Sequence, residues 1–122
     1  MLKMLSKKNI EICMQSIRLY RTTNFCIDYI SKEDRKKNSL MVNKISMFLV
    51  KLIEDKNDVK LEDLIVMIMD KEFMDTLYCA ILLNLSAVIA IRGVSKDDFK
   101  NIDDLEKIFK KLLEDVYMDG ED

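Results

Sequence analysis

Three pairs of adjacent carboxylates are the residues of this sequence whose type and spacing first suggest chemistry. The pairs are Glu33–Asp34, Asp97–Asp98 and Asp103–Asp104. Neighbouring carboxylates suit Mg²⁺, which proteins hold through one or two acidic side chains together with substrate phosphates. All three pairs lie at expected helix starts or in a connection, where acidic residues cap the backbone and offset the helix dipole. We therefore expect them to be structural, and we expect no metal and no other cofactor.

The other side chains that catalysis needs are missing or badly spaced. The chain has no histidine, which removes histidine-dependent nucleophiles, most zinc enzymes and the usual general base near neutral pH. Cys13, Cys26 and Cys79 have no metal-finger spacing and fall on apolar faces, so we expect them in the core. Neither Gly93 nor Gly120 belongs to a phosphate-binding loop. These absences predict a protein that is not an enzyme.

Charge is distributed unevenly along the chain. Residues 1–60 contain thirteen Lys or Arg and seven Asp or Glu, whereas residues 61–122 contain seven and fifteen. The N-terminal half is therefore basic within a chain whose net charge is −2. Such a split either steers a partner towards a dipolar surface or lets the two halves attract each other, and the second interpretation is the simpler one.

Eight residues are candidates for binding a partner, six of them basic and two apolar. Arg18 and Arg21 are one helical turn apart, and a second basic cluster follows soon after them in the sequence. Two methionines belong to an apolar excess on a short helix; methionine adapts to varied binding surfaces, although it also fills ordinary cores. The candidates are Arg18, Arg21, Lys32, Arg35, Lys36, Lys37, Met67 and Met69.

Two classes of partner fit these eight residues. Basic side chains can contact an acidic protein surface or the phosphates of a nucleic acid. The acidic isoelectric point, near 5.3, weighs against nucleic acid. The helix that follows the turn at Asp70 is also too apolar to lie in a DNA groove. We therefore expect a protein partner, with a second copy of the chain as one candidate, and keep a nucleic-acid-binding regulator as the alternative.

Helices must position these residues. The chain has no proline and only two glycines, and helix formers dominate it, so we expect an all-α fold. The pattern predicts one domain over residues 1–122, a compact bundle of five or six helices around a central apolar helix at about 71–92. Met74–Ile91 is apolar on nearly every side, so other helices should surround it. The apolar run within it is shorter than the ~20 residues of a bilayer span, so we expect no contact with a membrane.

Capping residues and apolar spacing predict the helix boundaries. The first helix should end near Ser31, and the polar segment 32–38 should connect it to the second. A short helix should end near Asn101 before the last one begins. The expected helix starts are Ser6, Asn38 or Ser39, Asp58, Asp70, Ser95 and Asp103. In the third helix, the residues expected to face inward are Leu61, Leu64, Ile65 and Ile68.

Composition also bears on origin and location. Lysine outnumbers arginine sixteen to four, and codons for Lys, Ile and Asn are AT-rich, as is typical of a virus, phage, mobile element or low-GC bacterium. The N-terminal residues do not form a signal peptide and the cysteines are odd in number, which predicts a cytoplasmic location. We therefore expect a small non-enzymatic interaction module, a regulator or inhibitor of viral, phage or mobile-element origin that binds a larger protein or complex.

Overall fold

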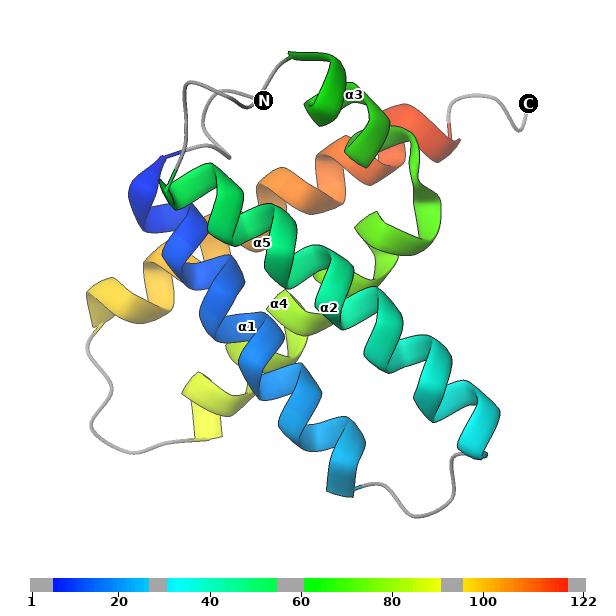
Figure 1. Cartoon of the computed structure of the whole chain (residues 1–122). Coiled ribbons are helices and arrows are strands. Elements are labelled where there is room, and N and C mark those ends of the chain that lie inside the picture. Colours follow the sequence, from blue (N-terminus) through cyan, green and yellow to red (C-terminus); the bar gives the residue numbers. More distant parts are fainter. Residues whose placement is uncertain (1–5, 27–30, 55–60, 91–95, 119–122) are drawn as a thin grey trace.

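Five α-helices and a closing π-helical turn make up the described part of the chain (Figure 1). The computed structural model describes residues 6–26, 31–54, 61–90 and 96–118. The elements are α1 (Lys7–Cys26), α2 (Lys32–Glu54), α3 (Leu61–Met69), α4 (Lys71–Ala90), α5 (Lys96–Leu113) and η2 (Glu114–Met118). No strand occurs among these residues. The expected all-α bundle is therefore confirmed.

Helix α4 is the centre of this bundle. It packs against α1, α2, α3 and α5, and in Figure 1 it passes behind α1 and α2. Met74, Ala80 and Ile81 have 0% of their surface exposed. The central apolar helix is thus confirmed, with its predicted last residues, 91 and 92, outside the described ones. The expectation that it is surrounded on every side is wrong, because its four neighbours leave Cys79 and Leu82 exposed.

Ser6 and Asp70 start helices as expected. The Oγ of Ser6 accepts a hydrogen bond from the backbone N–H of Asn9 at 3.2 Å, and Oδ1 of Asp70 accepts one from that of Phe73 at 3.1 Å. Each side chain satisfies an N–H of the first helical turn that has no partner within the helix. Helix α1 is described as far as Cys26, and its expected extension lies outside the described residues.

Helix α2 begins earlier than the sequence led us to expect. The Oγ of Ser31 accepts a hydrogen bond from the N–H of Asp34 at 3.2 Å. Glu33 and Asp34 occupy the first turn, where the helix dipole favours negative charge. The segment 32–38 contains neither glycine nor proline, so the helix continues through it. The predicted connection over 32–38, with a helix start at Asn38 or Ser39, is therefore wrong.

Helix α5 is one helix where two were expected. The predicted break near Asn101 and new start at Asp103 are wrong, because the apolar stripe continues through this point. Ile102 is 4% exposed and Leu105 is 0% exposed. Asp103 forms an ion pair with Lys107, which follows one turn later, at 3.0 Å between Oδ2 and Nζ. The helix starts predicted at Asp58 and Ser95 lie outside the described residues.

Polar contacts join α4 to its neighbours on two sides. The Nδ2 of Asn84 donates a hydrogen bond to Oγ of Ser16 at 3.0 Å, and this hydroxyl donates to the carbonyl of Ile12 at 2.7 Å. Both Asn84 and Ser16 are buried, so the contact fixes α4 against α1 inside the core. On the other side, the Tyr78 hydroxyl donates to Oε1 of Glu106 on α5 at 2.7 Å. Burial and this bond raise the pKa of Tyr78 to about 12.

Candidate interaction surfaces

The two cysteines with described side chains lack the setting of a nucleophile. Cys13 lies in the core, and burial raises the pKa of its thiol to about 12. Cys79 is exposed, so its predicted place in the core is wrong. Desolvation and then the charge of Asp75 raise its pKa. A catalytic cysteine needs a lowered pKa, so neither thiol is activated.

The acidic pairs are dispersed along the surface of the bundle. Asp97–Asp98 lies in the first turn of α5, as expected, whereas Glu33–Asp34 lies in the first turn of α2 and not in the expected connection. Asp103–Asp104 lies within α5 instead of at a helix start. Across the described ranges, no group of three or more Cys, Asp or Glu is arranged to hold a metal ion.

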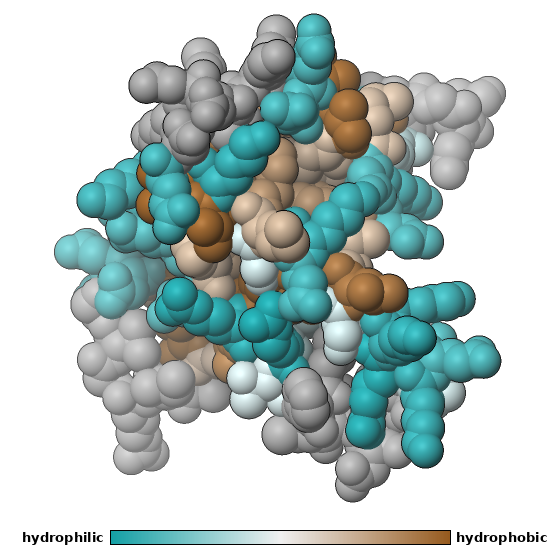
Figure 2. All heavy atoms as spheres, viewed as in Figure 1, coloured by the Kyte–Doolittle hydropathy of each residue, from teal (hydrophilic) through white to brown (hydrophobic). Residues whose placement is uncertain are grey.

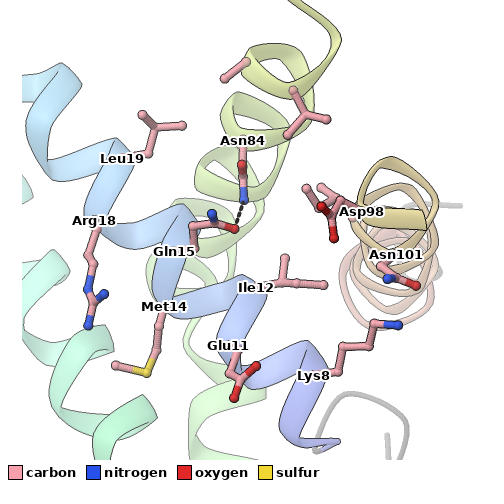
Figure 3. A pocket seen from close by; sticks show the side chains of 13 residues that line it. Lys8, Glu11, Ile12, Met14, Gln15, Arg18, Leu19, Asn84, Asp98 and Asn101 are labelled. Carbon is pink, nitrogen blue, oxygen red and sulfur yellow. Dashed lines mark hydrogen bonds between the residues drawn. The ribbon is translucent and has the colours of Figure 1, made fainter. Parts of the chain in front are cut away.

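A cleft of about 850 Å³ lies between α1, α4 and α5 (Figure 3). Gln15 points from α1 towards Asn84, whose Nδ2 is 3.5 Å from its Oε1, and Asp98 points in from α5. Arg18 lines the cleft but points towards the other side of α1. The buried amide of Asn84 already has partners in Gln15 and Ser16. Nothing in this arrangement resembles a catalytic set.

Arg18 and Arg21 extend the basic character of α1 towards α2. Both residues are exposed. The Nη2 of Arg21 donates to Oδ1 of Asn43 at 2.9 Å and to Oγ of Ser46 at 3.4 Å, and both acceptors lie on α2. Arg21 therefore links the two helices, whereas no such link is described for the exposed side chain of Arg18. Of the predicted basic residues of α1, Arg21 thus contacts the middle of α2.

The second basic cluster forms the first two turns of α2. Lys32, Lys36 and Lys37 are exposed, and Arg35 is half-buried. Figure 1 shows these turns (cyan) diverging from α1, and Figure 2 shows hydrophilic side chains over the same region. The structure thus places this cluster at the free end of a helix, some distance along α2 from the residues that hold Arg21.

Helix α3 separates the two candidate methionines. Met67 is 8% exposed and belongs to the core, whereas Met69 is 66% exposed. Val66 is also largely exposed, and so is Ile65, whose predicted inward orientation is wrong. The reason is that α3 packs chiefly against α4, which covers one side of a nine-residue helix. Leu64 and Ile68 face inward, as predicted, and Met67 is buried with them.

A groove of about 370 Å³ runs between α2 and α3. Phe48 and Phe73 line it, with ring centroids 5.8 Å apart at an interplanar angle of 86°, and Met67 of α3 lines it with them. Met47 of α2 and Val66 of α3 form its edges, and they are 74% and 69% exposed. Figure 2 shows apolar atoms gathered over these two helices. The α2–α3 groove is therefore apolar both at its base and at its edges.

The charges along the α2–α3 groove are segregated by helix. Lys44 and Lys51 lie on the α2 side, and Asp63 and Asp70 lie on the α3 side. The Nζ of Lys44 is 2.8 Å from Oδ2 of Asp70. This hydrogen bond, followed by the one from the N–H of Phe73, lowers the pKa of Asp70. One end of the groove is thus closed by an ion pair.

Sequence reasoning did not identify the α2–α3 groove. It did not single out Met47, which is exposed on α2 between the exposed Lys44 and Lys51. A methionine on a face otherwise formed by lysines was the available signal. The approach of α3 was not predictable, because it depends on residues far apart in the chain.

No family model, curated protein or solved structure matches this chain. In the described part of the molecule, no helix is both long enough and apolar enough to cross a membrane. The two surfaces, the basic residues of α1 and α2 and the α2–α3 groove, are therefore interpreted from their own chemistry.

Proposed function

We propose that the chain is a small non-enzymatic protein-interaction module that binds an acidic surface of a larger protein or complex. It acts there as a regulator or inhibitor of viral, phage or mobile-element origin. The observation that carries this proposal is the exposure of Arg18 on α1 and of Lys32, Lys36 and Lys37 in the first turns of α2, which are together called the basic surface. The setting of the thiols and of the acidic pairs supports a protein without catalytic activity.

The construction of this basic surface suits the capture of an acidic partner. The bonds from Arg21 to Asn43 and Ser46 fix α1 against α2, so the backbone beneath the charges is held in place. The lysines stand at the solvent-exposed end of α2 and keep their positive charges in water. Charges of this kind chiefly raise the association rate and favour oppositely charged partners, and salt screens them.

Nucleic-acid binding, the alternative, has less support from the geometry. Glu33 and Asp34 stand in the same helical turn as Lys32, and their carboxylates repel phosphates. The four basic residues of α2 therefore present a mixed surface, which an acidic protein with a few basic side chains can match better than a uniformly negative phosphate backbone.

Affinity capture with matched charge-reversal variants tests the proposal. The test variant carries Arg18→Glu, Lys36→Glu and Lys37→Glu, all at exposed positions. The control carries Lys100→Glu, Lys110→Glu and Lys111→Glu, which make the same charge change on exposed positions of α5. Each tagged chain is incubated with an extract of cells that naturally contain the protein, and bound proteins are identified by mass spectrometry.

We expect a protein that is captured by the wild-type chain and by the α5 control but lost with the basic-surface variant. Capture should also weaken as salt is raised. Equal capture by both variants would remove the basic surface from the proposal. If nuclease treatment abolished capture and the wild-type chain shifted nucleic acid in a gel at low salt, the nucleic-acid alternative would replace the protein partner.

A further inference from the structure

Large apolar side chains are exposed at the α2–α3 groove. Met47 and Val66 line the groove and are 74% and 69% exposed, and Met69, 66% exposed, follows Val66 by one turn at the end of α3. Contiguous apolar surface of this kind marks an interaction site in soluble proteins. Asn43 and Ser46, which hold Arg21, are not among the residues that line the groove.

The charges beside these apolar residues repeat in register along the two helices. Lys44 and Lys51 are seven residues apart on α2, and Asp63 and Asp70 are seven residues apart at α3 and its end. Seven residues are about two helical turns, or about 10 Å. The two helices run in roughly opposite directions in Figure 1, and Lys44 contacts Asp70. Lys51 therefore lies at about the same level of the groove as Asp63.

We propose that the occupant of the α2–α3 groove is a second copy of this chain, related by a two-fold axis that runs along the groove. With this axis, α3 of the second copy packs against α2 of the first. Residues at the same height along the groove then face each other. Lys51 then faces Asp63 of the second copy, and Lys44 faces Asp70 of the second copy. By symmetry every such contact occurs twice.

Charge selects this axis over the alternative. A two-fold axis across the groove would place α2 on α2 and α3 on α3, so that lysine would face lysine and aspartate would face aspartate. Like charges brought together at an interface oppose association and exclude that arrangement. The axis along the groove is the one for which the surface is complementary to itself.

The apolar residues match under the same operation. Met47 lies between Lys44 and Lys51 in the sequence, and Val66 lies between Asp63 and Asp70. The rotation therefore places Met47 against Val66 of the second copy and places the exposed Met69 beside this contact. Apolar anchors at the centre with charged pairs at the rim are the usual composition of a stable protein interface.

This dimer leaves the basic surface free. The partners of Arg21, Asn43 and Ser46, do not line the groove, and Lys36 and Lys37 lie on turns before the groove begins. Two copies therefore present two basic surfaces in one assembly. Where a larger complex offers two acidic sites, linked binding strengthens capture without any new contact.

A complementary charge swap tests the arrangement directly. Lys51→Glu and Asp63→Lys are made separately, together in one chain, and as an equimolar mixture of the two single variants. Lys110→Glu and Asp104→Lys on α5 serve as controls, and circular dichroism verifies the helical content of each protein. Sedimentation equilibrium then gives the dimer dissociation constant over a range of protein concentrations.

Each single variant should raise the dissociation constant by about tenfold or more, which corresponds to about 1.4 kcal/mol. The reason is that each single variant opposes like charges twice. The mixture should form a heterodimer with a constant within about threefold of wild type, because both of its charge contacts are attractive again. The double variant should form a homodimer of similar strength. The α5 controls should match wild type.

A second pair of variants tests the apolar centre of the groove. Met47→Asp should abolish self-association, whereas Leu40→Asp, at a 62% exposed position of α2 that does not line the groove, should not. Both positions are exposed, so neither change should unfold the monomer.

Three results would overturn the inference. The first is a wild-type chain that stays monomeric at every concentration, and the second is a dimer unaffected by Met47→Asp. The third is a mixture of charge variants that associates no better than its components, which would exclude the proposed axis. None of these results concerns the basic surface, so the proposed function stands or fails separately through its own capture experiment. If the chain is monomeric and a different protein is found bound in the groove, that protein replaces the second copy as the occupant of the groove.

Discussion

Helices α3 and α4 are both rich in apolar residues, yet the fold treats them differently. Four other helices pack against α4, and Met74, Ala80 and Ile81 lie completely buried within it. Helix α3 packs chiefly against α4 and leaves Val66 and Met69 largely in solvent. Helix α4 is the centre of the core. Helix α3 covers the core with one face and exposes apolar side chains on its opposite face.

The difference shows that an apolar sequence does not by itself specify burial. Helix α4 has twenty residues and spans the bundle, so several helices can pack along it. Helix α3 has nine residues, of which Leu64, Met67 and Ile68 already satisfy its contact with the core. The apolar residues on its other face have no folding role of comparable size. This is why we assign them to association.

The largest expected loss of stability in this comparison comes from a substitution that creates a cavity at α4. Ile81→Ala should lower the free energy of unfolding by about 2–5 kcal/mol, because it removes a completely buried side chain from a core that can relax only in part. Ile65→Ala on α3 is the matched control at a 48% exposed position, and it should cost less than about 1 kcal/mol. Urea unfolding followed by circular dichroism measures both. Equal losses would show that α3 is as much a part of the core as α4.

The sequence predicted the fold class and the central helix because these depend on composition and period. The absence of proline and the scarcity of glycine indicated an all-α fold. The continuous apolar run indicated a buried central helix. Boundaries were predicted well at Ser6 and Asp70, where a capping side chain follows a clear break in the pattern. They failed at Asn38 and Asp103, where polar residues with high helix propensity looked like a connection.

The surfaces were less predictable than the core. The exposed basic residues could be identified from the sequence because lysine and arginine rarely lie inside proteins. The α2–α3 groove could not, because it depends on how α3 returns against α2. The burial of Met67 and the exposure of Met69 depend on which side of α3 faces α4, and the period of a nine-residue apolar helix does not indicate that side.

The next expected effect concerns the buried polar contact of α4. Asn84→Ala should lower the free energy of unfolding by about 1–3 kcal/mol, because Ser16 loses its donor in the core and a small cavity forms. Asn43→Ala, which removes the exposed acceptor of Arg21 on α2, should cost about 1 kcal/mol or less. Thermal and urea unfolding of the two variants compare the contacts. A loss at Asn43 as large as that at Asn84 would contradict the view that burial sets the cost.

A smaller effect is expected at the junction of α3 and α4. Asp70→Ala removes the N-cap of α4 and should cost about 1 kcal/mol at neutral pH. The pKa of Asp70 is lowered in the folded protein, first by its hydrogen bond from Lys44. Its charge therefore stabilises the fold at pH above the ordinary value of 3.8, and this contribution disappears as the pH falls through the lowered pKa.

Asp70→Asn separates the charge at this position from the cap. Asparagine can still accept the N–H of Phe73 but cannot pair ionically with Lys44, so the variant should lose only a few tenths of a kcal/mol at pH 7. Its difference from wild type should vanish as the pH falls below the lowered pKa of Asp70, where both side chains are neutral. Urea unfolding at a series of pH values measures this difference. A gap between the two proteins that stays constant down to acid pH would show that the charge of Asp70 has no part in stability.

The smallest effect on the monomer is expected at Val66. Val66→Ser changes a 69% exposed side chain, so at high dilution the free energy of unfolding should stay within about 0.5 kcal/mol of wild type. At high protein concentration the two proteins should diverge. A dimer stabilises its folded subunits by mass action, so the melting temperature of wild type should rise with concentration and that of the variant should rise less. A side chain that matters only when the chain is concentrated has its partner in another copy, whereas one that matters equally at every concentration packs within its own fold. If the melting temperatures of wild type and Val66→Ser change equally with concentration, Val66 has no role in association. The apolar residues of α3 would then serve folding alone, as those of α4 do.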